Sequence, residues 1–214
     1  MILDHEKHEV PAARIIDVYK DRSLSLEDRF DRAGLGDSWK LAVSTRLKTS
    51  LKLQKGVMAI DAPANNFAMA ERSLPPGVTL AQCAVYSGTD KGASWGPGLA
   101  LVWKNKPLRI NLRAEGRYGV DDGAGQWFGG FVAPNYWYYL RIRVEKDEVL
   151  AEASPDGKLW ETIQALPRSQ FEGDPVAVRV GKMSPGSRAE DHTEPGVAGG
   201  SCLLKDLRAF SAKP

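Results

Sequence analysis

The chain of 214 residues is 43% hydrophobic and 26% charged, a balance that suits one globular domain with a core of its own. Its 29 basic and 27 acidic residues are spread along the chain and nearly cancel, so neither nucleic acid nor a membrane surface is expected as a partner. No apolar run approaches the roughly 20 residues that a membrane-spanning helix requires.

The N-terminal region differs from the rest of the chain in the spacing of its apolar residues. Residues 12–22 place apolar side chains loosely at helical spacing, which predicts one short helix within an exposed arm. The opening residues lack the basic-then-apolar order of a secretory signal, and the compartment stays open. We therefore divide the chain into an N-terminal arm, residues 1–29, and a domain, residues 30–214.

From Phe30 onward, short apolar or alternating segments are separated by Gly, Pro, Asn and Asp. Leu140, Ile142 and Val144, for example, alternate with charged residues, a pattern typical of a strand with one face in the core and one in water. The segments predicted as strands are 39–45, 56–62, 67–74, 77–87, 98–104, 108–115, 126–131, 136–145, 148–154, 159–166, 175–183 and 201–210. Such a series, with little helix between its members, predicts an all-β fold, a two-sheet antiparallel β-sandwich of the jelly-roll kind.

Two tight hairpins are predicted, one at residues 146–147 and one at residues 155–157, where Pro and Gly favour a turn. Together they make a three-stranded meander. The segment 184–200 is too long for a hairpin turn, and we expect it either as a solvated connection or as a rim over a site.

Cysteine and histidine are scarce. Cys83 and Cys202 both lie in apolar segments and are predicted to be buried free thiols, with a single disulfide as the alternative. His5, His8 and His192 all lie outside the predicted strands. The sandwich is therefore not expected to hold a histidine-dependent nucleophile or a histidine-rich zinc site.

The order of these segments resembles the concanavalin A-like lectin and glucanase superfamily, which includes laminin-G-like jelly rolls, over residues 28–210. The resemblance is above all to a bacterial family of this superfamily that has no assigned function and often accompanies secreted carbohydrate-active proteins. It implies a concave sheet that often faces glycans and a full-length protein that is exported, but no particular activity. The segments that carry it are EDRFDRAGLGDSWKL, GVMAIDAP, GLALVWK, YYLRIRVEKDEVLAEASPDGKLWETI, PVAVRVGKM and LLKDLRAF.

The glucanases of this superfamily carry their catalytic carboxylates as Glu-x-Asp-x-Glu, because residues two apart on a strand share a face. The nearest match here, residues 145–147, is followed by Val149 in the third position and falls on a predicted turn. A retaining glycosidase of that type is therefore not expected. A hydrolase or lyase that uses Glu115, Asp121 or Asp122 from loops stays open as an alternative.

Aromatic residues cluster between positions 95 and 139. Because sugars present flat apolar faces, an exposed ring flanked by polar side chains is a common solution for a glycan site. About half of these rings are expected in the core, whereas Trp95, Tyr118 and Trp127 lie beside glycine-rich loops and are predicted to be exposed. With polar residues of the neighbouring strand, the predicted ligand-binding set is Trp95, Trp103, Arg109, Arg113, Glu115, Tyr118 and Trp127.

A structural calcium ion is the one cofactor that the resemblance suggests. Jelly rolls of this superfamily often bind Ca²⁺ through carboxylate and backbone oxygens where the first and last strands meet, which points to Asp28 or Asp31 together with Asp206. We take Asp31 and Asp206 as the predicted ligands. Residues 121–122 and 190–194 are rival acidic clusters, although each is also typical of a solvated loop.

The leading hypothesis is a non-catalytic carbohydrate-binding module that holds a glycan or polysaccharide on its concave sheet by aromatic stacking. The alternatives are a glycoside hydrolase or lyase with loop carboxylates, and a protein-interaction module of the laminin-G type. The sequence leaves the particular glycan and the oligomeric state open.

Overall fold

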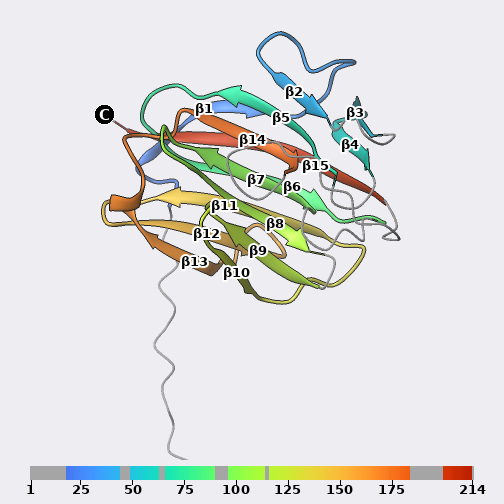
Figure 1. Ribbon diagram of the computed structural model, residues 1–214. Helices are drawn as coiled ribbons and strands as arrows, with labels where there is room; N and C mark the ends of the chain where they lie inside the picture. Colours follow the sequence, from blue (N-terminus) through green and yellow to red (C-terminus); the bar gives the residue numbers. More distant parts are fainter. Residues whose placement is uncertain are drawn as a thin grey trace, which may run out of the picture.

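The computed structural model of the chain describes residues 18–43, 49–62, 66–89, 96–113, 116–183 and 200–213. Over these residues the chain forms two stacked sheets in which every pairing of neighbouring strands is antiparallel (Figure 1). The predicted all-β sandwich is confirmed. No helix in this part of the chain is long and apolar enough to span a bilayer.

The first sheet has eight strands. Seven of them follow one path, in the order β13 (Glu161–Pro167), β12 (Glu148–Ser154), β11 (Trp137–Val144), β6 (Val78–Tyr86), β15 (Gly200–Ala212), β4 (Val57–Ala62) and β3 (Ser50–Gln54). The eighth strand, β1 (Arg22–Asp28), pairs with β15.

The second sheet has seven strands. Their order is β10 (Gln126–Gly129), β9 (Arg117–Asp121), β8 (Pro107–Arg113), β7 (Pro97–Val102), β14 (Ala177–Lys182), β5 (Ala68–Ser73) and β2 (Lys40–Val43). A single 3₁₀ turn, η1 (Arg168–Gln170), follows β13. In Figure 1, β9, β10, β12 and β13 lie at one end of the sandwich and β2, β3 and β4 at the other.

The sandwich extends further toward the N-terminus than the predicted boundary at residue 29. Strand β1, at residues 22–28, belongs to the segment predicted as an arm, yet it pairs with β15 along its length. Of the residues predicted as a helix, 18–21 form turns, while 12–17 lie outside the described residues. Register explains the strand, because Leu26 and Asp28 point inward and are buried.

Both predicted hairpins are confirmed: β11 pairs with β12, and β12 pairs with β13. The second turn is closed by side chains, since the Ser154 hydroxyl accepts a hydrogen bond from the Gly157 N–H at 2.9 Å and Asp156 accepts one from the Lys158 N–H at 2.8 Å. Gly157 has a φ of +73°, a conformation that glycine adopts without strain.

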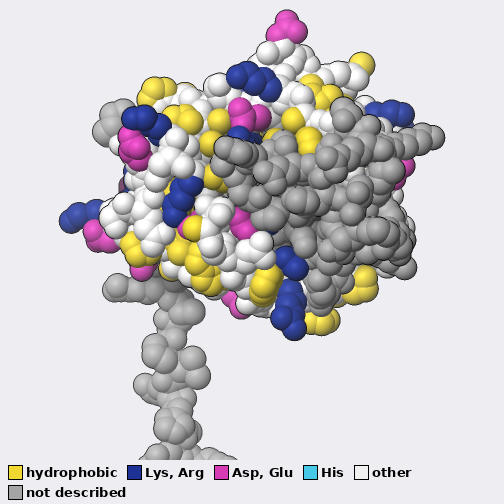
Figure 2. All heavy atoms as spheres, viewed as in Figure 1, with side chains coloured by type: hydrophobic (Ala, Val, Ile, Leu, Met, Phe, Trp, Pro, Cys, Tyr) yellow, Lys and Arg dark blue, Asp and Glu magenta, His cyan; other side chains and the backbone are white. Residues whose placement is uncertain are grey.

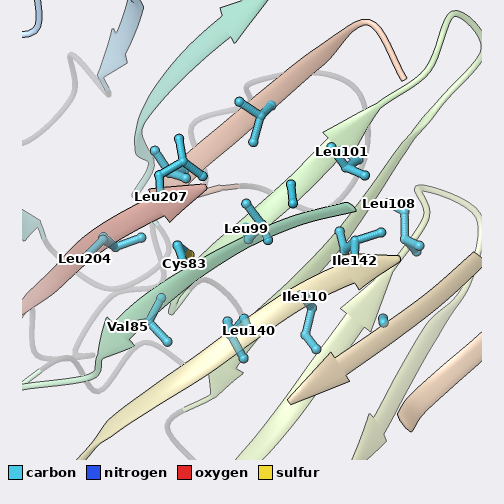
Figure 3. Packing of buried hydrophobic residues seen from close by; sticks show 14 of the residues in the cluster. Cys83, Val85, Leu99, Leu101, Leu108, Ile110, Leu140, Ile142, Leu204 and Leu207 are labelled. Atoms are coloured by element: carbon cyan, nitrogen blue, oxygen red, sulfur yellow. The ribbon is translucent and has the colours of Figure 1, made fainter. Parts of the chain in front are cut away.

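The core lies between the two sheets and is built from the inward-facing residues of nearly every strand. Figure 3 shows its centre, where Leu99 of β7 and Ile110 of β8 lie close to Leu140 of β11. Cys83 and Cys202 are buried free thiols, as predicted, and burial raises the pKa of Cys83 well above its ordinary value. Each buried leucine or isoleucine contributes roughly 2 kcal/mol of transfer free energy, so this layer supplies the main driving force for folding.

Strand β15 lies in the middle of the eight-stranded sheet and changes partner halfway along. Residues 200–204 pair with β4 on one side, residues 207–212 pair with β1 on the same side, and β6 lies along the other. The change occurs at Asp206, whose φ is +53° and which sits in an irregularity of the pairing with β6. This last strand therefore joins β1 and β4 to the rest of the sheet.

Candidate functional site

Strand β8 shows how the outer face of the seven-stranded sheet is built. Leu108 and Ile110 are buried in the core, and because side chains alternate along a strand, Arg109, Asn111 and Arg113 point away from it. The predicted alternation is confirmed. The prediction of a wet outer face is wrong for Arg109 and Asn111, which are both buried.

The register of the seven strands aligns their outward-facing residues into rows that cross the whole sheet. One row, called here the charged row, consists of Gln126, Asp121, Arg109, Ala100, Arg179, Glu71 and Lys40. The next row, called the glycine row, consists of Phe128, Gly119, Asn111, Gly98, Gly181, Met69 and Ala42. Met69, Ala100 and Met183 form a small apolar cluster on this face, separate from the main core.

Arg109 occupies the centre of the charged row and is only 4% exposed. Its Nη2 lies 3.8 Å from Asp121 Oδ2, and its Nη1 donates a hydrogen bond to the carbonyl oxygen of Met183. Because Met183 follows β14, the side chain must reach across β7, where the small residue Ala100 lies directly opposite Arg109. Its Nε has no hydrogen-bond partner in the described part of the chain. Burial lowers the pKa of Arg109 to about 10, while the Asp121 charge opposes that shift.

The other end of the charged row carries a second ion pair. Arg179 Nε lies 2.6 Å from Glu71 Oε2, and Lys40 is the next residue along the row. The row ends at an open hollow of about 410 Å³ beside β2 and β5. The residues that line the hollow are Asp37, Ser38, Lys40, Glu71, Arg72 and Ser73.

Three residues at the β8–β9–β10 end of the sheet, Arg113, Arg117 and Phe128, are called here the arginine corner. The Arg113 guanidinium carbon lies 4.3 Å from the centre of the Phe128 ring. Gly119 lies directly opposite Phe128, and a Cβ at that position would fall 2.6 Å from Arg113 Cδ, so the missing side chain makes room for Arg113. Arg117 lies directly opposite Arg113 and is exposed, and Phe128 is 45% exposed.

The two acidic residues described on this face, Asp121 and Glu71, are held in ion pairs and lie far apart. Asp121 on β9 and Glu71 on β5 are four strand spacings apart, about 19 Å. Glycosidases place their two carboxyl groups roughly 5 to 10 Å apart. Asp121 and Glu71 therefore cannot work as a catalytic pair in this arrangement.

Asp122, another carboxylate proposed from the sequence, caps the turn between β9 and β10. It accepts hydrogen bonds from Lys106 Nζ at 2.6 Å and from the N–H groups of Ala124 and Gly125. Burial alone would raise the pKa of Asp122, but these hydrogen bonds lower it below its ordinary value. It is therefore a charged structural group at neutral pH rather than a proton donor.

Three of the predicted aromatic residues, Trp103, Tyr118 and Trp127, face the core instead of the surface. Trp103 is buried with its ring centre 4.5 Å from that of Phe171, and Tyr118 is buried with its ring 5.8 Å from that of Tyr138. Trp127 is half-buried and packs against the core. The predicted exposure of Tyr118 and Trp127 is therefore wrong, since both occupy inward-facing positions of their strands.

Two further predicted site residues, Trp95 and Glu115, lie outside the described residues. One outward-facing aromatic residue that the prediction missed is Phe128, next to Trp127 in β10. The alternation in Gln126–Gly129 is the sequence signal that assigns one ring to each face, but it does not say which face is which.

The outer face of the eight-stranded sheet carries a different polar arrangement, called here the arginine–glutamate network. Glu152 Oε2 lies 2.6 Å from Arg141 Nε, and Glu152 Oε1 lies 3.0 Å from Arg143 Nη2. Arg143 also contacts Glu145 at 2.7 Å, and the Arg141 guanidinium lies 4.0 Å from the centre of the Trp160 ring. Burial alone would raise the pKa of Glu152, but the two arginines lower it below its ordinary value.

Asp28, one of the residues considered for calcium, already binds a cationic side chain. Its two carboxylate oxygens accept hydrogen bonds from Arg32 Nη1 and Nη2 at 2.7 and 2.8 Å, and Trp39 Nε1 donates another at 2.9 Å. The Phe30 N–H donates a further one at 2.8 Å. The guanidinium and indole groups therefore fill the positions that a metal ion would need, and Asp28 does not fit a calcium ligand.

The other two calcium candidates do not come together in a larger acidic cluster. Asp31 is exposed, and Asp206 lies half-buried at the irregularity in β15. Among the described residues, no group of three or more His, Cys, Asp and Glu side chains could hold a metal ion. Calcium binding at Asp31 and Asp206 stays a prediction.

Solved structures with the same fold include carbohydrate-active enzymes. The catalytic domain of an endo-1,3-beta-glucanase (laminarinase) from Thermotoga petrophila superposes with a TM-score of 0.64 at 12% identity, over 91% of this chain and 99% of that one. A glycosyl hydrolase family 16 protein from Mycobacterium smegmatis gives a TM-score of 0.61 at 14% identity, over 87% and 100%. A GH43 protein from Bacillus licheniformis gives 0.62 at 15% identity, over 86% of this chain but 39% of its own.

The chain has the concanavalin A-like jelly-roll fold. At these identities the likeness establishes the jelly roll and not an activity. No protein-family profile matches the sequence, and no curated protein matches it significantly. Any function must therefore be argued from the side chains that this jelly roll presents.

Proposed function

We propose that the chain is a non-catalytic carbohydrate-binding module that holds a glycan on the outer face of its seven-stranded sheet. The observation that carries the proposal is the charged row. In a fold shared with glucanases, the carboxylates described on this face, Asp121 and Glu71, are committed to ion pairs about 19 Å apart.

Ligand binding uses the groups that this face presents. Phe128 offers a half-exposed ring to the apolar face of a sugar, and Arg113, stacked on that ring, holds hydrogen-bond donors beside it. The hollow next to Lys40 and Glu71 provides room for a chain at the opposite end of the sheet. Trp95, predicted as a stacking residue, precedes β7 and is included as a second contributor.

Affinity electrophoresis through gels that contain single polysaccharides tests the proposal. Replacing the exposed ring, Phe128→Ala, should weaken retention by about fivefold to tenfold because the stacking surface is lost. Trp95→Ala should weaken retention in the same gel. The matched control is Leu24→Ala on β1, another half-exposed apolar residue, which should leave retention unchanged.

Two outcomes would count against the proposal. Absence of retention in every gel would remove carbohydrate binding. Release of new reducing ends from any polysaccharide would favour the hydrolase alternative, and the variants Asp121→Asn and Glu71→Gln would then show whether these carboxylates take part.

A further inference from the structure

Exposed aromatic rings gather in one short segment of the chain. Among the described residues, the large apolar side chains that are exposed are Leu24, Leu41, Phe128, Phe131, Tyr136, Leu159 and Val176. The three aromatic members all fall within residues 128–136, where Phe128, Phe131 and Tyr136 are 45%, 77% and 64% exposed. Figure 2 shows hydrophobic side chains along the lower edge of the domain, where Figure 1 places β10 and β13. Single exposed apolar residues are normal, whereas several rings in one segment mark a binding surface.

This segment leads from one sheet to the other. Phe128 lies in β10, the edge strand of the seven-stranded sheet, and Trp137 begins β11 of the eight-stranded sheet. Residues 130–136, called here the aromatic loop, make the connection. The Phe128 ring lies on the face proposed to bind glycan, and Phe131 follows within about 11 Å of chain. Its exposed aromatic surface therefore continues from the sheet onto the loop.

The middle of the aromatic loop is anchored to the sandwich. Val132 is buried, and its N–H donates a hydrogen bond to the carbonyl oxygen of Gly116 at 2.9 Å. The N–H of the next residue, Ala133, donates one to the Tyr138 hydroxyl at 2.8 Å. Phe131 therefore extends into solvent from a backbone whose position is fixed directly after it.

The end of the aromatic loop is held in a similar way. Asn135 has a φ of +62°, a left-handed conformation that is uncommon for residues other than glycine, and its Oδ1 accepts a hydrogen bond from the Tyr86 hydroxyl at 3.4 Å. On the other side of Tyr136, the Trp137 ring packs with its centre 5.6 Å from that of Tyr86. Tyr136 thus lies between two held residues while its own ring stays exposed.

Fixed, exposed rings suit a sugar chain. Phenylalanine and tyrosine side chains have few rotatable bonds, and an anchored backbone leaves little further freedom to lose on binding. Their flat faces can stack on the apolar faces of sugars, while the Tyr136 hydroxyl and the exposed Asn135 side chain can form hydrogen bonds with sugar hydroxyls. The exposed rings of Phe131 and Tyr136 add little to the core.

We infer that the aromatic loop extends the proposed glycan site beyond the sheet, so that the ligand is a long polysaccharide chain instead of a short oligosaccharide. The inference rests on the proposed carbohydrate-binding function and names its ligand class. A short oligosaccharide on the sheet would contact Phe128 alone, whereas a polymer would contact Phe128 and the two rings of the loop.

Titration calorimetry with three polymers, each paired with its own trisaccharide, tests the inference. The pairs are laminarin and laminaritriose, xylan and xylotriose, and polygalacturonate and trigalacturonate. At least one polymer should bind, about tenfold or more tighter than its trisaccharide, because two further rings are engaged. A polymer also offers many overlapping sites, so the variants decide between the two causes.

Ring substitutions locate the extension. Phe131→Ala and Tyr136→Ala should each weaken polymer binding by about threefold to tenfold and leave trisaccharide binding unchanged, whereas Phe128→Ala should weaken both. Tyr136→Phe keeps the ring and should keep most of the binding. Leu24→Ala is the matched control, a half-exposed apolar residue on β1 that should have no effect. Because Phe131 and Tyr136 are exposed, the midpoint of thermal unfolding should not change.

The outcomes separate the inference from the proposed function. Unchanged polymer binding in both loop variants would overturn the inference and keep the function. Equal weakening of polymer and trisaccharide by the loop variants would also overturn it, since the loop would then be the whole site. Ring-dependent sedimentation with vesicles of phosphatidylcholine and phosphatidylglycerol would assign the loop to a membrane surface instead. Absence of binding to all three polymers would overturn both.

Discussion

The outer faces of the two sheets each carry an arginine that is 4% exposed, and their surroundings differ. Arg141, on the eight-stranded sheet, has Glu152 at 2.6 Å and the Trp160 ring at 4.0 Å. Arg109, on the seven-stranded sheet, has Asp121 at 3.8 Å and an Nε without a hydrogen-bond partner in the described part of the chain. Equal burial therefore conceals different roles. The first arginine completes a compact structural network, and the second belongs to a face whose polar groups are not arranged for maximal stability.

Removing the acidic centre of the arginine–glutamate network should give the largest effect. Glu152→Ala leaves Arg141 and Arg143 without their shared carboxylate in a mostly buried position. We expect a loss of about 3 to 5 kcal/mol in the free energy of unfolding, the usual cost of breaking one side of a buried ion pair. Urea denaturation followed by tryptophan fluorescence measures it, and a loss below about 1 kcal/mol would show that the network is not structural.

The equivalent change on the other face should cost less. Asp121→Asn removes the charge opposite Arg109, but the pair is already long at 3.8 Å and the amide oxygen can still accept the Gly123 N–H. We expect a loss of about 1 to 2 kcal/mol in the same urea experiment. A loss equal to that of Glu152→Ala would remove the contrast between the two faces.

The pH dependence of stability should also distinguish the two faces. We expect its effect to be smaller than those of Glu152→Ala and Asp121→Asn. The pKa of Glu152 is lowered in the folded state, so the folded protein binds fewer protons than the unfolded one as the pH falls. The stability that Glu152 contributes is therefore present above its unfolded pKa and is lost as the pH falls through its folded pKa. Between about pH 5 and pH 3, the wild type should lose more stability than Glu152→Gln, whose side chain does not titrate. Parallel pH profiles of the two proteins would contradict the assignment.

Much of the fold could be predicted from local pattern, and three short strands escaped prediction. Every predicted strand overlaps an observed one, but β1, β3 and β9 were missed. In β1 only Leu26 and Asp28 are buried, and in β3 only Leu53 is. Strand β1 is mostly exposed and is held by pairing with the distant strand β15, which leaves little periodic signal in its own sequence. Strands β3 and β9 instead pair with strands next to them in the sequence, and each is only five residues long.

The candidate site was predictable only in part, because the direction of a side chain depends on register. Leu108 and Ile110 mark the inward side of β8 clearly, so Arg109 was assigned to the correct face. Tyr118 has only Val120 to mark its side of β9, and its neighbouring glycines suggested exposure instead. A shift of one residue in the pairing exchanges the two faces, and only the long-range partner strands fix that choice.

The position of β15 has a consequence for how the molecule comes into being. The described pairings connect β1 and the β3–β4 hairpin to the rest of their sheet only through residues 200–212. During synthesis, β1, β3 and β4 leave the ribosome before β15, so their pairings with the rest of this sheet cannot form until residues 200–212 have emerged. We therefore expect the eight-stranded sheet to be completed late in folding, when β15 pairs with β1, β4 and β6.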